Sequence, residues 1–261
     1  MELLLAQDVG KDDITTALLA KPKKIIQAEI RAKEKGILAG VEETKFFLKR
    51  KGVRILKNKK DGATVKKNDV VFVLQAPAKK ILTLERVVLN LIQRMSGIAT
   101  ATAKLAKKIG KNKFSATRKT PLGLLDSRAV VVGGGLPHRL NLADMILVKE
   151  NHLAVDPNCW KKIHTKDFFE IEADSPKLAL AIAEHFSKSR NLILLLDNFS
   201  VAQFRETATA IRKINPKIIL EASGGIDEKT APKFLAAGAD FVSLGKLTNT
   251  VGVVDFSLSV V

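Results

Sequence analysis

Basic side chains are concentrated in one segment of the chain, between Ala116 and Leu153. The segment also contains three consecutive glycines at positions 133–135, where the backbone could approach a ligand closely or form a flexible loop. Guanidinium groups bind carboxylates and phosphates through paired hydrogen bonds, and ammonium groups bind them as point charges. The segment therefore predicts a ligand with more than one anionic group. Its basic residues are Arg118, Lys119, Arg128, His138, Arg139, Lys149 and His152.

Two acidic residues stand at the ends of later apolar runs. Glu172 belongs to FFEIEAD, and Asp197 ends NLILLLD. Carboxylates in such positions can bind a divalent cation, accept hydrogen bonds from sugar hydroxyls or stabilise a developing positive charge. The residues alone leave these three roles open.

A glycine-containing loop follows the next apolar run, KIILEAS, which ends at Ser223. Gly224 and Gly225 then precede a predicted helix, whose first backbone N–H groups lack partners within the helix and can bind phosphate oxygens. A tight strand-to-helix turn would use the same residues. The following run ends at Gly245 and Lys246, and phosphate sites between the last two loops recur in βα barrels. We therefore expect a phosphate site there.

Six apolar runs alternate with helical patterns in the carboxyl-terminal part of the chain. Ser200 is a helix start signal, Gly238 is a stop signal, and the runs recur at intervals of roughly 25 residues, close to one βα unit. Such units form a parallel sheet, open or closed into a barrel, whose functional side chains gather at the carboxyl ends of the strands. The residues above would then converge on one edge. The runs are KFSATRK, DMILVK, FFEIEAD, NLILLLD, KIILEAS and FVSLG.

The first hundred residues have a different pattern. IIQAEIRAK alternates apolar and polar residues, as a half-buried strand does, and VVFVLQAP reads as a second strand. From Leu84 to Ile98, apolar residues recur every third or fourth position, which predicts one long amphipathic helix. This part of the chain is therefore expected to be α+β.

Composition limits the classes of function. The net charge of +17 permits nucleic-acid binding, but the lysines are scattered and there is no Tyr and only one Trp for stacking on bases. With Cys159 as the one cysteine, an intrachain disulfide or a multi-cysteine metal cluster is excluded. The segment MELLLAQDVG has too short an apolar run for a secretory signal or a membrane span. A cytoplasmic globular protein is expected, with no membrane partner and no nucleic acid.

Nine sequence blocks carry a resemblance over nearly the whole chain. They are DVGKDDITTALL, GILAGVEE, LERVVLNLIQRMSGIATAT, ATRKT, GGGLPHRLNLADMILVKENH, EIEAD, LLDNFS, LEASGGI and SLGKLTNT. In this order they resemble the quinolinate phosphoribosyltransferase family.

The resemblance implies a two-domain α/β fold. An amino-terminal α/β sandwich domain would span residues 1–98, joined by the carboxyl-terminal segment 246–261, and an incomplete six-stranded parallel α/β barrel would span 99–245. It also implies a homodimer or a higher homo-oligomer in which neighbouring subunits share active sites.

The implied reaction joins quinolinate to phosphoribosyl pyrophosphate, with Mg2+, and yields nicotinate mononucleotide, pyrophosphate and CO2 for NAD biosynthesis. The family's quinolinate-binding residues match Arg118, His138, Arg139, Lys149 and the partner subunit's Arg86. Its catalytic residues match Lys119, placed between the substrates, and Glu172 and Asp197, near the ribose and, directly or indirectly, the metal. Its phosphate loop matches Ser223, Gly224, Gly225 and Gly245.

Two departures from the family pattern bear on the site. TRKTPLGLLDSRAV lacks the arginine of the family's TRKTTPGLR and is shorter, and we hypothesise that Arg128 supplies the missing charge. The family's GALTHS is GKLTNT here. We hypothesise that Asn249 keeps the hydrogen bond of the replaced histidine and that Lys246 restores its charge.

Two alternatives compete with this interpretation. A related pyrophosphorylase-like protein of molybdate-uptake operons shares TRKT, GGG and HR but lacks the lysine that Lys149 matches, so Lys149 favours the quinolinate enzyme. A basic, catalytically silent nucleic-acid-binding protein is disfavoured by Glu172 and Asp197, because acids at the expected site would repel a phosphate backbone.

Overall fold

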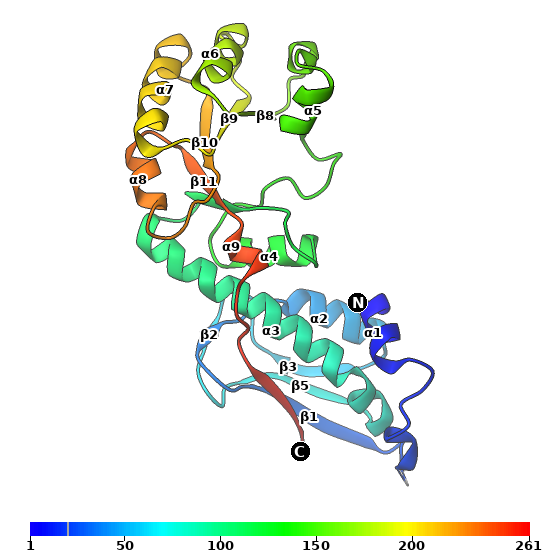
Figure 1. The fold of residues 1–261 in the computed structure, drawn as a ribbon. Coiled ribbons are helices and arrows are strands. Elements are labelled where there is room, and N and C mark those ends of the chain that lie inside the picture. The colour runs from blue at the N-terminus through cyan, green and yellow to red at the C-terminus, as the bar shows by residue number, and fades with distance from the viewer. Residues whose placement is uncertain (20) are drawn as a thin grey trace. The chain divides into compact units, whose positions relative to one another are not determined.

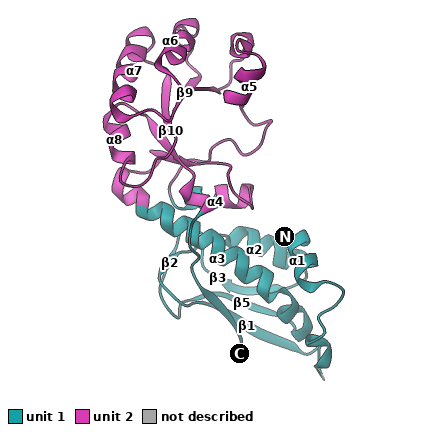
Figure 2. Ribbon diagram, viewed as in Figure 1, with its two compact units in different colours: residues 1–104, 128–133, 250–261 teal, residues 105–127, 134–249 magenta. Residues whose placement is uncertain are grey.

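The chain folds into two compact units. The computed structural model describes residues 1–19 and 21–261. The first unit comprises Met1–Lys104, Arg128–Gly133 and Thr250–Val261, and the second comprises Leu105–Ser127 and Gly134–Asn249 (Figure 2). The domain boundaries expected at residues 98 and 245 stay a prediction.

An antiparallel sheet in the order β12-β1-β5-β3 is the framework of the first unit (Figure 1). Ala28, Ile30 and Ala32 of β1 are buried, whereas the residues between them are less buried, because successive side chains of a strand point to opposite faces. The carboxyl-terminal strand lies beside β1, with Leu258 opposite Ile30. The strands are β1 (Ile25–Ala32), β3 (Arg54–Asn58), β5 (Val70–Pro77) and β12 (Phe256–Val260), and a separate pair is β2 (Gly36–Ile37) and β4 (Thr64–Val65).

The predicted long helix is present as α3 (Ala78–Ile109). Its apolar side chains Leu84, Val88 and Ile92 are buried in one core with Ile30 and Phe72 of the sheet. Burial of each such side chain contributes about 1.5–3 kcal/mol, so the stripe accounts for the position of the helix on the sheet. The other helices of this unit are α1 (Glu2–Val9), the 3-10 helix η1 (Thr16–Leu18) and α2 (Val41–Arg50).

A six-stranded parallel sheet in the order β6-β11-β10-β9-β8-β7 forms the second unit. Each of the six predicted runs supplies one strand. Since β6 and β7 are the two edges of the sheet, the barrel is incomplete, and the predicted fold class is confirmed. The strands are β6 (Phe114–Ala116), β7 (Ile146–Val148), β8 (Phe169–Ala173), β9 (Leu192–Asp197), β10 (Ile219–Ser223) and β11 (Phe241–Leu244).

Helices connect these strands, and local sequence signals set where they begin. The Ser200 hydroxyl accepts the N–H of Gln203 at 3.2 Å, and the Gln203 side chain accepts the N–H of Ser200 at 3.1 Å, which is a capping box at the start of α7. The helices are α4 (Leu124–Val132), α5 (Glu150–Val155), the 3-10 helix η2 (Cys159–Lys162), α6 (Pro176–His185), α7 (Val201–Ile214), α8 (Ala231–Ala236) and α9 (Lys246–Asn249). Within residues 1–19 and 21–261, no helix combines the length and apolarity needed to cross a bilayer.

Candidate active site

A cavity of about 440 Å³ lies at the carboxyl ends of the parallel strands. Period two decides which residues face it, because alternate side chains of β8, β9 and β10 point to the inner face of the sheet. The predicted residues that line it are Arg118, Lys119, His138, Arg139, Lys149, Glu172, Asp197 and Ser223. The structure therefore brings together the anion-binding cations and both acids.

A second cavity of about 310 Å³ adjoins the first, and Lys119, Asp197 and Ser223 line both. The remaining residues of the predicted phosphate loop line only this second cavity: Gly224, Gly225, Gly245, Lys246 and Asn249. The position of Lys119 at the junction matches its expected place between two substrates.

The predicted phosphate loop needs glycine at position 224 for a steric reason. Gly224 has φ of +88°, and a Cβ there would lie 2.2 Å from Oδ1 of Asn198 and 2.6 Å from its backbone nitrogen. Gly225 also has positive φ, +62°, but nothing lies within 4 Å of the place of its Cβ. The β10–α8 loop is thus packed against the β9–α7 loop at Gly224 and open at Gly225.

Arg86 is an exposed residue of α3 in the first unit and does not line either cavity, and its expected role in the partner subunit's site stays a prediction. Two expectations for the basic segment are not supported among the described residues. Arg128 also belongs to the first unit, where its Nε lies 3.5 Å from Oε1 of Glu43, so the hypothesis that it replaces the family's arginine is not supported. Gly133 is required by packing instead of by a ligand, because a Cβ would lie 2.4 Å from Cβ of Thr102 on α3.

Lys149 and Glu172 form an ion pair across the ends of β7 and β8. Glu172 is almost fully buried, whereas the Lys149 side chain is 45% exposed, so the ammonium group remains accessible to a ligand. The backbone N–H of Lys149 donates to Nδ1 of His152 at 2.9 Å. His152 is therefore a hydrogen-bond partner that orders the start of α5.

Arg139 has unused hydrogen-bonding capacity. Its Nη1 donates to the carbonyl of Met145 at 3.3 Å, but its buried Nε has no hydrogen-bond partner among the described residues. Burial, followed by the neighbouring charge of Arg118, lowers the pKa of Arg139, whereas Glu170 raises it. An anionic ligand would accept a hydrogen bond from this free Nε of Arg139 and neutralise the two neighbouring guanidinium groups.

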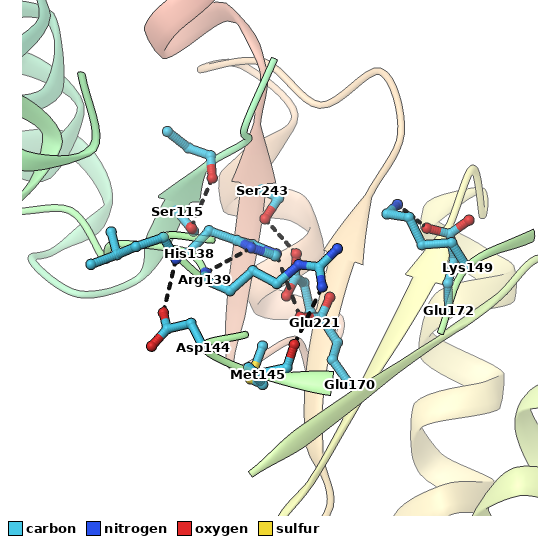
Figure 3. A network of polar contacts seen from close by, with 12 residues as sticks. Ser115, His138, Arg139, Asp144, Met145, Lys149, Glu170, Glu172, Glu221 and Ser243 are labelled. Carbon is cyan, nitrogen blue, oxygen red and sulfur yellow. Dashed lines mark hydrogen bonds and ion pairs between the residues drawn. The ribbon is translucent and has the colours of Figure 1, made fainter. Parts of the chain in front are cut away.

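Sequence reasoning missed a buried polar layer below these residues. Glu170, Glu221 and Ser243 are each at most 5% exposed, and Ser243 donates a hydrogen bond to Glu221 (Figure 3). Glu170 and Glu221 precede the predicted site residues Glu172 and Ser223 by two positions on the same strand, and Ser243 of β11 precedes Gly245, the residue just after that strand, by two positions. The period of two could have identified them, because residues i and i−2 share one face of a strand.

Glu221 is the most perturbed acid of this layer. Burial, and then the charge of Glu170, raise the pKa of Glu221 well above its usual range, although the hydrogen bond from Ser243 acts in the opposite direction. Burial and the neighbouring carboxylate of Glu170 therefore both favour the protonated form of Glu221.

Comparison with known proteins agrees with this geometry. Residues 13–96 match the family model described as quinolinate phosphoribosyl transferase, N-terminal domain, and residues 98–259 match its C-terminal domain. The chain belongs to the quinolinate phosphoribosyltransferase family.

Alignments with similar proteins extend over nearly the whole length of this chain. A relative from Archaeoglobus fulgidus named probable nicotinate-nucleotide pyrophosphorylase [carboxylating] is 36% identical, over 92% of this chain and 96% of its own. A mitochondrial protein of Nicotiana tabacum named quinolinate phosphoribosyltransferase [decarboxylating] 2a is 31% identical, over 100% and 81%. The crystal structure of NadC from Streptococcus pyogenes has 32% identity and a TM-score of 0.84, covering 100% of this chain and 95% of that one. The family predicted from the sequence is confirmed.

Proposed function

We propose that this chain transfers the phosphoribosyl group of phosphoribosyl pyrophosphate to quinolinate and forms nicotinate mononucleotide, pyrophosphate and CO2, a step of NAD biosynthesis. The observation that carries the proposal is the convergence of Arg118, Arg139 and Lys149 in one cavity that adjoins a glycine-lined loop. Quinolinate is a dianion, and three cations suit its two carboxylates. Membership of the family supports this activity.

The first step is substitution at C1 of the ribose. The bond from C1 to the pyrophosphate oxygen breaks with its electron pair on oxygen, and the pyridine nitrogen of quinolinate supplies the pair that forms the new bond to C1. The ribosyl centre becomes cationic on the way, and we assign its stabilisation to the carboxylates of Glu172 and Asp197, which line the cavity. Catalysis therefore consists of positioning and charge complementarity, without a protein nucleophile.

The second step is loss of the carboxylate next to the ring nitrogen. After nitrogen has bonded to C1 it carries a positive charge, so it can accept the electron pair of the breaking carbon–carboxylate bond as CO2 leaves. A proton from water then replaces CO2 on the ring carbon. The cations keep the substrate oriented for both steps, and no dedicated protein base is required.

The donor set fits magnesium. Asp197 lines both cavities and is only partly buried, and its Oδ2 accepts a hydrogen bond from the side-chain amide of Asn198 at 2.6 Å. Glu172 is already paired with Lys149. Mg2+ prefers oxygen ligands and keeps several waters, so we propose that Asp197 holds it directly or through water, with Glu172 as the less available ligand. When bound, the ion would neutralise the leaving pyrophosphate.

We further propose that the site is completed by a second copy of the chain, in a homodimer or higher homo-oligomer. Arg86 is exposed and does not line the cavities, which is what a residue reaching a partner's site requires. A cytoplasmic location likewise remains a prediction.

The test is to incubate the purified protein with quinolinate, phosphoribosyl pyrophosphate and Mg2+ and to measure nicotinate mononucleotide and CO2. Nicotinate serves as a parallel substrate, because it lacks the second carboxylate. We expect product from quinolinate alone. Product only from nicotinate, or none from either substrate, would contradict the proposal and point to another anionic ligand.

A further inference from the structure

A third cavity, of about 700 Å³, lies at the amino-terminal ends of the parallel strands. Phe168 and Asn191 precede β8 and β9, and Phe241 begins β11, so this amino-terminal cavity is at the opposite end of the sheet from the candidate active site. Phe168 is 51% exposed, which places it at the mouth. The volume lies in the range of small-molecule sites, and no step of the proposed reaction uses it.

Two buried carboxyl groups line the amino-terminal cavity. Glu170 is 1% exposed and Glu221 is 0% exposed, and each has one buried oxygen, Oε1 of Glu170 and Oε2 of Glu221, without a hydrogen-bond partner among the described residues. The other oxygens are occupied, because Oε2 of Glu170 lies 3.5 Å from Nε2 of His138 and Glu221 accepts the hydroxyl of Ser243. Burying carboxyl oxygens without a donor is costly, so this position calls for a positive or donating group.

The spacing of the two carboxyl groups suits a single nitrogen. Figure 3 shows Glu170 and Glu221 in one group, and an oxygen of each lies within 4.8 Å of the other. Hydrogen bonds from a charged nitrogen to a carboxylate are about 2.7–2.9 Å long, so one ammonium or amidinium nitrogen can donate to both oxygens. The raised pKa of Glu221 does not remove this acceptor, because a protonated carboxyl group still accepts through its carbonyl oxygen.

The charge of this lining differs from that of the whole chain. The chain carries +17, whereas acids outnumber permanent cations in the lining of the amino-terminal cavity. A lining of this sign attracts a cation and disfavours the anionic substrates proposed above. The acids are Asp144, Asp167, Glu170 and Glu221, and the permanent cations are Arg139 and Lys166.

Apolar side chains form the other part of the wall. They are Leu136, Met145, Phe168, Ile193 and Phe241. Such side chains suit an apolar or flat aromatic body, and an aromatic ring also attracts a cation that lies over its face. The cavity therefore combines two free carboxyl oxygens with apolar walls.

We propose that the amino-terminal cavity binds a small organic cation, whose ammonium or amidinium group donates to Glu170 and Glu221 and whose apolar body contacts Phe168 and Phe241. His138 and Arg139 line both this cavity and that of the anion-binding cations, and they keep the quinolinate-binding roles assigned above. The inference goes beyond the proposed function and does not depend on it.

Benzamidine is the probe, because it joins an amidinium group to a flat apolar ring. Isothermal titration of the full chain without substrates should show one molecule bound per chain with a Kd of about 1 mM or tighter. Benzamide has nearly the same shape without the charge, and it should bind at least about tenfold more weakly. No saturable binding of benzamidine up to about 10 mM would overturn the proposal, because water alone would then satisfy the carboxyl groups. Equal affinities for the two compounds would overturn the assignment to a cation.

Two substitutions locate the bound probe. We expect Glu170→Gln to weaken benzamidine binding at least about tenfold, because a charged hydrogen bond is lost, and Phe168→Ala to weaken it severalfold. Phe46→Ala, at an exposed phenylalanine of α2 that does not line the cavity, should have no effect. Thermal unfolding verifies that each variant is folded, and the exposed Phe168 serves where Glu170→Gln fails to fold. Unchanged affinity in both variants would overturn the proposal.

The acids of the candidate active site are the other place where a cation could bind. Asp197 lines both cavities of that site and does not line the amino-terminal cavity. We expect Asp197→Asn to leave the affinity for benzamidine unchanged, and loss of binding in this variant would overturn the proposal. A protein that is inactive on quinolinate but binds benzamidine through Glu170 would refute the proposed function and leave this site standing.

A metal ion is the alternative occupant of the two carboxyl groups. Zinc is therefore measured in the protein after dialysis against Zn2+, and we expect no stoichiometric amount to remain. One zinc ion per chain that excludes benzamidine and is lost in Glu170→Gln would overturn the assignment to an organic cation.

Discussion

Substitution of Arg139 should affect the kinetics of quinolinate much more than those of phosphoribosyl pyrophosphate. It lines the cavity of the cations and is not among the residues that line the phosphate cavity. We expect Arg139→Ala to lower kcat/KM for quinolinate by a factor equivalent to about 1.5–3 kcal/mol, with a much smaller change in KM for phosphoribosyl pyrophosphate, because charged hydrogen bonds to one substrate are lost. Steady-state kinetics measure this, with Arg205→Ala on the exposed face of α7 as control. Equal effects on both substrates would refute the assignment.

The raised pKa of Glu221 predicts that the free energy of unfolding depends on pH. Its pKa in the folded protein is raised, chiefly by burial and then by Glu170, with smaller and opposite effects of Lys149 and Glu172. The folded state therefore binds this proton more tightly than the unfolded chain. The resulting stability is complete below the unfolded pKa, about 4.3, and is lost as the pH rises toward the folded pKa.

Glu221→Gln imitates the protonated side chain and should remove this loss. We expect its free energy of unfolding to decline less than that of the wild type as the pH rises above the unfolded pKa, with the two proteins converging near that pKa. Thermal unfolding across this range tests it, and Glu206→Gln, an exposed glutamate of α7, should follow the wild type. A constant offset at every pH would argue against a titration at Glu221.

At the scale of elements, the β10–α8 loop offers a matched pair of glycines. Gly224→Ala would place a Cβ against backbone of the β9–α7 loop, whereas Gly225→Ala meets open space and only the strain of positive φ, about 1 kcal/mol. We expect Gly224→Ala to raise KM for phosphoribosyl pyrophosphate and lower the melting temperature more than Gly225→Ala does. Similar effects of the two substitutions would show that the packing against Asn198 does not shape the loop.

The short helix α9 carries the departure GKLTNT. Lys246 and Asn249 both line the phosphate cavity, as expected if they replace the family's histidine. We expect Lys246→Ala to raise KM for phosphoribosyl pyrophosphate several-fold and to leave KM for quinolinate nearly unchanged, because only a phosphate contact is lost. Lys233→Ala on α8 is the control, since Lys233 does not line this cavity. An unchanged KM for phosphoribosyl pyrophosphate would refute the replacement.

At the scale of the whole molecule, shared sites predict complementation between inactive subunits. Chains with Arg86→Ala and chains with Lys149→Ala would each form defective sites alone, but a mixed dimer would contain one site with neither change. Random reassociation of equal amounts should recover about a quarter of wild-type activity, because half of the dimers are mixed and each has one intact site of two. No recovery in a verified mixed dimer would exclude Arg86 as the partner's contribution.

Local pattern predicted the parallel strands, the long helix and the edge where the candidate side chains meet, whereas the sandwich and the incomplete barrel followed from the family resemblance. The six apolar runs are the six parallel strands, and the stripe from Leu84 to Ile98 is part of α3. Burial on one face selects apolar residues with a period of two in strands and of about 3.6 in helices, so these elements can be predicted without knowing the tertiary structure. The rule that parallel strands present function at their carboxyl ends then placed Arg118, Lys149 and Ser223 in adjoining cavities.

The sequence by itself therefore determined the strands, their order along the chain, the family and the side chains that meet at one end of the sheet. Only the tertiary structure decided which side chains form ion pairs, which are buried away from water and which residues are required for packing. Glu172 is tied to Lys149, Arg128 lies beside Glu43, Gly133 is needed by α3, and Glu170 lies under His138. These outcomes depend on the distances between residues that are far apart in the chain and on how completely water is excluded from between them. A local sequence pattern contains information on neither the distances nor the desolvation.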